Sequence, residues 1–276
     1  MYLSNNSNSS ISISNTVKDN NSSIADEFLR LENELVNRLT DFNTTLLLRS
    51  TVEYIYNPLE YAYDVHKNFV HKYCSSSKKI LFLGMNPGPW GMMQTGVPFG
   101  DVISVKKWLK ITGVIRKPLK EHRLRPVSGF DCKRIEVSGK RFWAFAQQLS
   151  HGNPALFFSN CFVHNYFPLV LMTESGKNVT PADLKPAEKK ELESVCDESL
   201  CSVIDLLQIE VIIAIGRYTE KRVNAALKKT PKNVHVIYIM HPSPRNPKSN
   251  QEWMPNVINC LSENGLLNYF QETKTW

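Results

Sequence analysis

The chain has 276 residues, of which 42% are hydrophobic and 10% aromatic, and this composition is enough to bury a sizeable core. Its 33 basic and 26 acidic residues leave a net charge of +7, which is compatible with a polyanionic partner but also occurs in proteins that bind no nucleic acid. No stretch approaches the roughly 18 consecutive apolar residues of a transmembrane helix, so no membrane partner is expected.

The first 23 residues differ in composition from the rest, because serine and asparagine supply 14 of them. Such a stretch lacks the apolar side chains that offset the entropy of ordering, so residues 1–23 are predicted to be a disordered tail. It has neither the basic start nor the apolar core of a signal peptide. Residues 24–276 contain no repeat and no linker, and are predicted to form a single, monomeric domain.

The first half of the domain is predicted to contain three helices and one strand. Apolar residues at three- and four-residue spacing over 24–42 indicate an amphipathic helix. Ile80–Met85 is a short apolar strand, and Asp101–Ile111 is a second helix. A basic, proline-containing connection over 113–137 leads to a third helix, for which Ser138 is expected to be the N-cap.

The second half alternates strands with helices. Strands are predicted at Ala155–Asn165, Val211–Gly216 and Val234–Met240, and helices at Pro186–Gln208, Thr219–Lys229 and Gln251–Leu261, with a long polar loop after the first strand. This alternation, together with two almost purely apolar strands, predicts an α/β fold with a parallel sheet covered on both faces.

The cysteines do not form a recognisable site. No pair makes a C-x-x-C motif, and their scatter matches no zinc or iron–sulfur spacing. Six free thiols in a reducing compartment are therefore expected, with no metal site and no cofactor. The six residues are Cys74, Cys132, Cys161, Cys196, Cys201 and Cys260.

Two proline-rich loops at strand exits are the strongest pointers to function. The loop Gly84–Gly91 presents the amide of Asn86, and the loop His241–Pro247 presents an imidazole. Ligands of open α/β sheets bind outside the carboxyl ends of the strands, so the two loops could converge on one site. Considered singly, Asn86 could be an ordinary turn residue and His241 a buried, hydrogen-bonded histidine.

The functional interpretation of each residue is more specific. Asn86 could orient a water but could not act as a general base, and His241 could donate to charge that develops in a reaction. Phe99 is either a core aromatic or a stacking platform for a planar ring. Asn165 is either a strand-end turn residue or an amide that pairs with the edge of a pyrimidine. Together the four suit cleavage at a planar, uracil-like base, although neither loop contains a carboxylate to act as base.

These segments closely resemble the motifs of the single-strand-selective monofunctional uracil-DNA glycosylases. The resemblance covers about residues 25–270, and one departure is Trp90, where the family commonly has phenylalanine, which puts the substrate range in doubt. The matching segments are Gly84–Met92, Gln94–Gly100, Val137–Trp143, Cys161–Asn165, Asn178–Ala182 and His241–Pro247.

The resemblance implies the uracil-DNA glycosylase fold, a three-layer α/β/α sandwich around a short, mainly parallel four-stranded sheet. It also implies base-excision repair: excision of uracil and of C5-oxidised uracils such as 5-hydroxymethyluracil from single- and double-stranded DNA. Asn86 would position the attacking water, and His241 would stabilise the charge on O2 of the departing base. A nuclear location follows from that substrate.

The remaining site residues are also implied by the resemblance. Phe99 would stack on the base, Asn165 would read its N3 and O4 edge, Met85 would line the pocket through its backbone, and Gly88 would leave space at C5. The loop after His241 would insert into the duplex. The residues implied to contact DNA are Ser175, Lys177, Asn178, Pro242, Ser243, Pro244, Arg245, Asn246 and Pro247.

Two other classes of function stay open on the sequence alone. A catalytically silent protein that binds damaged DNA would need neither Asn86 nor His241. A hydrolase of free nucleosides would have little use for the rigid loop around Arg245 or for the basic charge balance. No lysine lies in either loop motif as a Schiff-base nucleophile, so strand cleavage is not expected.

Overall fold

A four-stranded parallel sheet forms the centre of the molecule in the computed structural model, which describes residues 22–244, 250 and 252–271. Its order is β3-β2-β6-β7, so the chain adds β3 on one side of β2 and then β6 and β7 on the other. All three pairings are parallel, which confirms the predicted sheet. The strands are β2 (Ile80–Gly84), β3 (Cys161–Asn165), β6 (Val211–Ile215) and β7 (His235–Ile239).

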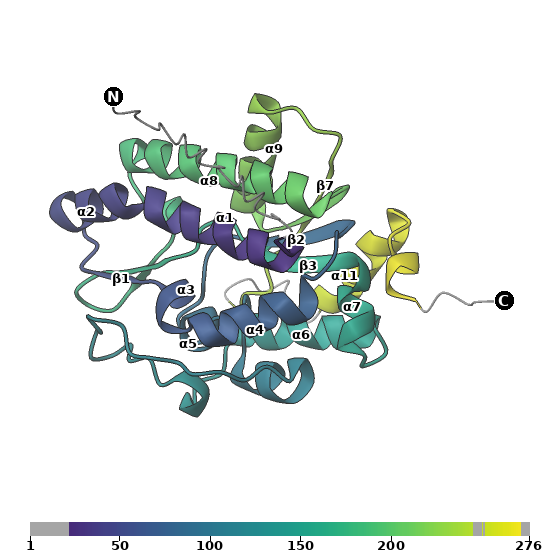
Figure 1. Cartoon of the computed structure of the whole chain (residues 1–276), viewed down its shortest axis with the longest axis horizontal. Helices are drawn as coiled ribbons and strands as arrows, with labels where there is room; N and C mark the ends of the chain where they lie inside the picture. Colours follow the sequence, from purple (N-terminus) through teal and green to yellow (C-terminus); the bar gives the residue numbers. More distant parts are fainter. Residues whose placement is uncertain (1–21, 245–249, 251, 272–276) are drawn as a thin grey trace, which may run out of the picture.

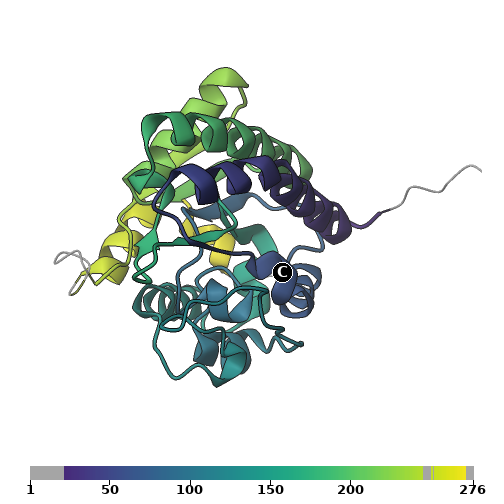
Figure 2. The ribbon, with the colours of Figure 1, turned by 90° about the vertical axis from the view of Figure 1, so that its left-hand side faces the viewer.

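Helices cover both faces of this sheet and complete the predicted three-layer α/β/α sandwich (Figures 1 and 2). One layer contains α1 (Ile24–Arg38), α8 (Pro186–Leu207) and α9 (Arg217–Lys229). The other contains α4 (Tyr63–Tyr73), α6 (Val137–Leu149), α7 (Pro154–Asn160) and α11 (Trp253–Glu263). In this second layer the aromatic rings of α6 and α7 pack on the fully buried Phe82 of β2. None of the helices in the described ranges is both long and apolar enough to cross a bilayer.

The predicted strand over Ala155–Asn165 is wrong in its first half, which is helix α7. Asn153 accepts a hydrogen bond from the backbone N–H of Ala155 at 3.0 Å, and Pro154 occupies the first helical turn. Both features begin helices, and they outweigh the strand-like composition that follows. The strand proper, β3, starts only at Cys161. It ends at Asn165, as predicted.

Other element boundaries also differ from the prediction, three of them by more than two residues or in the type of helix or cap. The helix expected over 24–42 ends at Arg38 and is followed by α2 (Thr40–Arg49). The helix expected at Asp101–Ile111 is a π-helical segment, Ser104–Leu109. Ser138 is not the N-cap of α6, because the helix already starts at Val137 and Glu136 occupies the capping position.

A second, smaller sheet and three short helices were not predicted. The antiparallel strands β1 (Tyr54–Tyr56), β4 (Val170–Met172) and β5 (Asn178–Val179) form the sheet, in the order β1-β4-β5. Strands this short carry too few residues to show an alternating pattern. Of the three helices, α3 (Pro58–Tyr61) and α5 (Met92–Thr95) are single turns. The third is α4, which is longer. Because β5 lies in the predicted polar loop, the second sheet anchors the segment that was expected to contact DNA.

The predicted tail lies almost entirely outside the described residues. Of its members only Ser22 and Ser23 are described, and the Ser23 side chain accepts from the N–H of Asp26 at 3.1 Å to cap α1. All six cysteines lie in the described ranges and are free thiols.

Candidate active site

A small pocket at the carboxyl ends of β2, β3 and β7 collects the four residues that the sequence singled out. Asn86 follows β2, Asn165 ends β3, His241 follows β7, and Phe99 comes from the connection after β2. The pocket lining is Asn86, Gly88, Gly91, Met92, Phe99, Glu136, Ser138, Asn165 and His241. The predicted convergence of the two loops on one site is therefore what the structure contains.

Phe99 is held in a backbone conformation that a side-chain-bearing residue rarely adopts. Its φ is 54°, in the left-handed region, and its carbonyl accepts from the N–H of Asp101 at 2.7 Å and from the indole of Trp143 at 2.9 Å. Gly139 makes this approach possible, because a Cβ there would lie 2.1 Å from the Phe99 oxygen. Strain of this kind costs about 1–3 kcal/mol and is typical of functional sites.

Helix α6 therefore acts as the support of the aromatic ring in the pocket. Phe142 stacks on Phe99 with ring centroids 4.7 Å apart and planes 20° from parallel. The segment Val137–Trp143 thus holds Phe99 in three ways. Gly139 allows the Phe99 carbonyl to approach the helix, Phe142 stacks on its ring, and the Trp143 indole donates to its carbonyl. A planar ligand lying on Phe99 would meet a ring that is fixed before binding, which lowers the entropy cost of recognition.

Asn165 is equally fixed. Its Nδ2 atom lies 3.2 Å from the sulfur of Met92, and only 4% of the residue is exposed. Gly84, beside it on β2, allows this arrangement, because a Cβ at that position would lie 2.4 Å from the Asn165 Oδ1 atom and 3.0 Å from the Phe99 ring. The glycine thus lets an amide and an aromatic ring share one end of the pocket.

The side-chain oxygen of Asn86 is available to accept a hydrogen bond. Its Nδ2 atom donates to the carbonyl of the adjacent Pro87 at 3.1 Å, and no hydrogen bond to Oδ1 occurs within the described part of the chain. An amide held in this way can accept from a water and hold it, but it cannot remove a proton from that water.

His241 reaches the pocket across the end of β6. The residue there is Gly216, with φ at 97°, and a Cβ at that position would lie 3.6 Å from the Cβ of His241. The chain on both sides of the histidine is held in place: Trp253 donates to the carbonyl of Met240 at 2.6 Å, and Arg141 donates to the carbonyl of Pro242 at 3.0 Å.

Burial lowers the pKa of His241 to about 4, well below the usual value of a histidine. At neutral pH the ring is therefore an uncharged imidazole, which donates one hydrogen bond from one nitrogen. A neutral donor can stabilise a developing anion without first having to be protonated, as in an oxyanion hole.

We expect an NMR titration of the His241 ring protons to show a midpoint near pH 4, with no inflection between pH 5.5 and 8. The pKa is lowered because burial disfavours the charged form of the ring, so the proton is gained only in acid. The His241→Leu variant lacks this imidazole and serves as the control that assigns the resonance. A midpoint above 6.5 for His241 would mean that its active form is the imidazolium.

Glu136 is a pocket residue that the sequence did not predict. Burial raises the pKa of its carboxyl, while the backbone N–H groups of Ser138 and Trp90 favour the charged form and oppose that rise. The space expected beside Gly88 is occupied by Glu136. A Cβ at Gly88 would lie 2.8 Å from an oxygen of its carboxyl group. Glu136 directly precedes the matching segment Val137–Trp143 but is not part of it, and it lies far in sequence from both loops.

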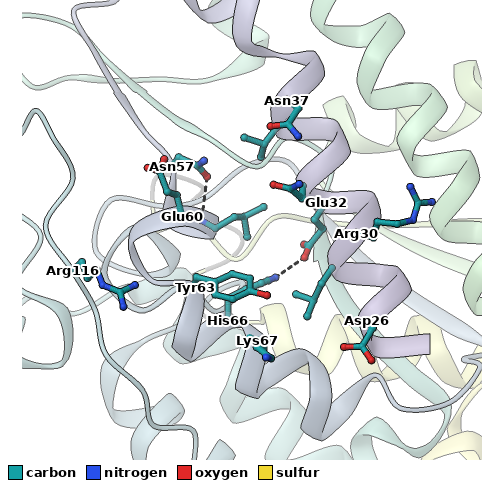
Figure 3. Close-up of a pocket in the computed structure, with 14 residues that line it drawn as sticks. Asp26, Arg30, Glu32, Asn37, Asn57, Glu60, Tyr63, His66, Lys67 and Arg116 are labelled. Carbon is teal, nitrogen blue, oxygen red and sulfur yellow. Dashed lines mark hydrogen bonds and ion pairs between the residues drawn. The ribbon is translucent and has the colours of Figure 1, made fainter. Parts of the chain in front are cut away.

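A buried ion pair braces the site from the side of α1. Glu32 lies 2.6 Å from Nε2 of His66 (Figure 3). The Nδ1 atom of His66 lies 2.7 Å from the carbonyl oxygen of Gly96. Both ring nitrogens face oxygen atoms, an arrangement that favours the doubly protonated imidazolium. Burial lowers the pKa of His66, but the attraction of Glu32 and the bonds to Glu32 and Gly96 outweigh it and leave the pKa raised. The pair ties α1 and α4 to the turn that carries Phe99.

Comparisons with known proteins agree with this geometry. A family model described as "Uracil DNA glycosylase superfamily" matches residues 71–261. A protein of Bos taurus named single-strand selective monofunctional uracil DNA glycosylase is 45% identical over 89% of this chain and 88% of its own length. The protein of the same name from Rattus norvegicus is 46% identical over 89% of this chain and 86% of its own length.

The chain belongs to the single-strand-selective monofunctional uracil-DNA glycosylases, within the uracil-DNA glycosylase superfamily. The fold is also shared more widely. A crystal structure of Pedobacter heparinus SMUG2 matches with a TM-score of 0.62 over 88% of this chain and 98% of that chain, at 17% identity. At so low an identity this match concerns the fold alone.

The pocket borders a wider groove that contains most of the residues expected to contact DNA. Glu136 and Ser138 line both, so the groove and the pocket adjoin. The ring of Trp90 lies in it, with the guanidinium of Arg125 at 5.1 Å and that of Arg134 at 5.3 Å from the ring centroid. Predicted residues that line it are Ser175, Lys177, Asn178, Ser243 and Pro244.

The other predicted residues lie elsewhere. Met85 does not line the pocket, and its carbonyl accepts from the N–H of Phe167 at 2.9 Å. Pro242 is bound by Arg141 at the start of the His241 loop. Arg245, Asn246 and Pro247 lie outside the described residues. Within residues 22–244, 250 and 252–271, no group of three or more His, Cys, Asp or Glu side chains could hold a metal ion.

Proposed function

We propose that this protein hydrolyses the N-glycosidic bond of uracil and of C5-oxidised uracils in single- and double-stranded DNA, and leaves the strand intact. Membership of a family of uracil-DNA glycosylases makes it a glycosylase, which is a hydrolase. The observation that carries the proposal is the meeting of Asn86, Phe99, Asn165 and His241 in one pocket. A flat ring, a fixed amide and a neutral donor together fit a neutral pyrimidine with two carbonyl oxygens.

The bound base would lie on Phe99 with its N3–O4 edge on the Asn165 amide. To arrive there it must leave the stack, which costs a few kcal/mol and is least costly for a single strand or a mismatch. His241 would then donate to O2, where negative charge gathers as the bond to the sugar breaks. A single donor of this kind is worth about 3 kcal/mol of transition-state stabilisation.

Water attack would follow on the side of Asn86, whose free amide oxygen can hold the nucleophile. An amide suffices because the sugar has become cationic by then, and a cationic carbon needs no strong base to activate water. Neither loop motif contains a lysine that could form a Schiff base, so the strand would not be cut.

The groove beside the pocket favours a polymer over a free nucleoside as substrate. The guanidiniums of Arg125 and Arg134 flank Trp90, and neither forms an ion pair with a carboxylate in the described ranges. Cations available in this way can bind phosphates on either side of the flipped nucleotide. We further propose that Arg245, Asn246 and Pro247 insert into the duplex, and that the protein acts as a monomer in the nucleus, where such DNA is found.

The test is an excision assay on a labelled oligonucleotide that contains one uracil. We expect release of uracil and an intact abasic strand that breaks only on later treatment with alkali. The same strand with thymine in place of uracil is the control. Failure to release uracil from either single- or double-stranded DNA, across a range of salt concentrations, would contradict the proposed function.

A further inference from the structure

A buried carboxylate interrupts the apolar face of α1. Glu32 lies on the same face of the helix as Phe28 and Leu35, which are four residues before it and three residues after it, and only 4% of Glu32 is exposed. An aliphatic side chain at this position would pack into the core without desolvating a charge, and replacing a buried ion pair by apolar residues is often neutral or stabilising. The carboxylate is therefore a candidate for a role beyond the stability of the fold.

Glu32 faces two histidines, one with each carboxylate oxygen. Its Oε2 atom lies 2.6 Å from Nε2 of His66, and its Oε1 atom lies 3.5 Å from Nδ1 of His164 on β3. Burial lowers the pKa of His164, and the attraction of Glu32 does not overcome that effect. The ring of His164 is therefore neutral at pH 7, and the charged partner of Glu32 is His66.

His66 extends this contact to the carbonyl of Gly96, from which its Nδ1 atom lies 2.7 Å. Gly96 ends α5 with φ at 72°, and its N–H donates to the carbonyl of Met92 at 2.8 Å. The backbone approaches α4 closely here, because a Cβ at Gly96 would lie 3.0 Å from the carbonyl oxygen of Ala62. Gly96 is thus held by α5 through its N–H and by His66 through its carbonyl.

Gly96 lies between the two sides of the base pocket. Before it in the chain, Met92 lines the pocket, and its sulfur lies 3.2 Å from Nδ2 of Asn165. After it, Phe99 follows three residues later, with its backbone in the left-handed region. A displacement of Gly96 would therefore disturb the amide and the aromatic ring of the pocket together.

We propose that Glu32 is a positioning residue for base binding, which holds His66 against Gly96. The two sides of the pocket, Asn165 and Phe99, thereby keep the spacing that a flipped pyrimidine requires. The inference rests on the proposed function, because it assumes that these two residues hold the base. Glu32 acts from a distance, since it and His66 line a separate cavity of about 720 Å³ between α1 and α4 that shares no lining residue with the base pocket (Figure 3).

The size of the effect follows from the charge on His66. A hydrogen bond to a charged group changes an equilibrium by about tenfold to a hundredfold, more than a bond between neutral groups. Losing the bond to Gly96 should lower the population of enzyme in which the pocket is correctly formed. The rate of excision at saturating enzyme should therefore fall, whereas the affinity for the parts of the strand outside the pocket should not.

The test compares two double variants whose side chains at position 66 have nearly the same shape. Glu32→Leu with His66→Leu leaves no donor for the Gly96 carbonyl, whereas Glu32→Leu with His66→Asn places an amide N–H where Nδ1 of the histidine was. We expect the first to lower the single-turnover rate of uracil excision by about tenfold or more, and the second to recover most of that rate. Both should fold, because neither leaves an unpaired buried charge.

Two single variants complete the set. Glu32→Gln keeps a hydrogen bond to His66 without its charge, so we expect a loss of rate of about threefold, because a bond between neutral groups is weaker than a charge-assisted one. Glu60→Gln makes the same substitution at an exposed position in the lining of the same cavity, and should leave the rate unchanged.

Affinity for a strand that carries a tetrahydrofuran abasic analogue in place of the target separates positioning from DNA binding, and should not change in any variant. Equal losses of rate and of this affinity would mean that the ion pair supports the fold as a whole, and the proposal would be wrong. Equal rates in the two double variants would also overturn it. If neither double variant folds, a wild-type rate in Glu32→Gln has the same consequence.

The wild-type protein separates this inference from the proposed function. If it releases no uracil from any strand, the proposed function fails and this inference fails with it. Normal release by the wild type, together with unchanged rates in all the Glu32 variants, would contradict the inference alone.

Discussion

Replacing His241 with leucine is expected to lower the single-turnover rate of uracil excision by about a hundredfold to a thousandfold, the usual cost of removing one oxyanion donor. Leucine has similar bulk and keeps the pocket closed, but it has no N–H to place against O2 of the base. The neutral histidine donates weakly to the bound base and strongly to the anion that forms from it. Binding of the DNA before reaction should therefore change far less than the rate, by about threefold or less.

The two quantities can be measured separately. Affinity is obtained from the anisotropy of a labelled strand that contains a 2′-fluoro nucleotide, whose glycosidic bond resists cleavage. His235→Leu makes the same substitution at the exposed start of β7, away from the pocket, and should leave both quantities unchanged. Equal losses of rate and affinity in His241→Leu would mean that the imidazole only binds.

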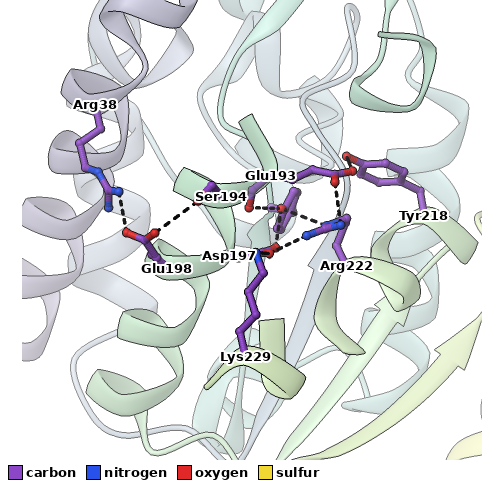
Figure 4. A network of polar contacts seen from close by, with 9 residues as sticks. Arg38, Glu193, Ser194, Asp197, Glu198, Tyr218, Arg222 and Lys229 are labelled. Carbon is purple, nitrogen blue, oxygen red and sulfur yellow. Dashed lines mark hydrogen bonds and ion pairs between the residues drawn. The ribbon is translucent and has the colours of Figure 1, made fainter. Parts of the chain in front are cut away.

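Replacing Arg222 with methionine is expected to destabilise the fold by about 3–5 kcal/mol, as is usual when one partner of a buried ion pair is removed. Arg222 connects α9 to α8, where it lies 2.5 Å from Asp197 and 2.7 Å from Glu193 (Figure 4). The side chain of Asp197 is only 3% exposed, so without Arg222 its charge would be balanced by Lys229 alone, at 3.1 Å. The network includes the hydroxyl of Tyr166, which donates to Asp197 at 2.8 Å and belongs to the residue that follows Asn165.

Urea denaturation of the variants measures this effect. The surface pair of Arg38 and Glu198 is the control, with side chains 40% and 59% exposed, and Arg38→Met should cost less than about 1 kcal/mol. A double variant, Arg222→Met with Asp197→Leu, should recover part of the loss because the buried Asp197 carboxylate is removed together with its partner, and the charges left behind on Glu193 and Lys229 reach solvent. Similar losses for Arg222→Met and Arg38→Met would mean that the buried network contributes little.

The site could be predicted where its chemistry lies in contiguous motifs. Asn86 and His241 each sit in a rigid loop at a strand exit, and parallel strands place such exits on one edge of the sheet. Phe99 and Asn165 were found in two further motifs, Gln94–Gly100 and Cys161–Asn165. Glu136 was missed because it is an isolated acidic residue in front of a helix, and only the packing of α6 against Phe99 carries it to Gly88.

Local composition also misled the prediction of one element. The run after Asn153 is rich in phenylalanine and reads as strand, yet Asn153 and Pro154 begin a helix there. Its rings are buried against Phe82 and Phe142, so tertiary packing decided between two conformations that the side chains alone allow. The short strands of the second sheet depend on their partners in the same way.

The sequence by itself determined the alternation of strands and helices, the two loops and the family, because these depend on local patterns and on residues adjacent in the chain. Only the tertiary structure decided how the residues of the pocket are held. The left-handed backbone of Phe99 depends on its contacts with Gly139 and Trp143. His241 packs beside Gly216, and the side chain of Glu136 fills the space beside Gly88. Each is a contact between distant segments, and close contacts of that kind depend on packing distances that no local pattern records.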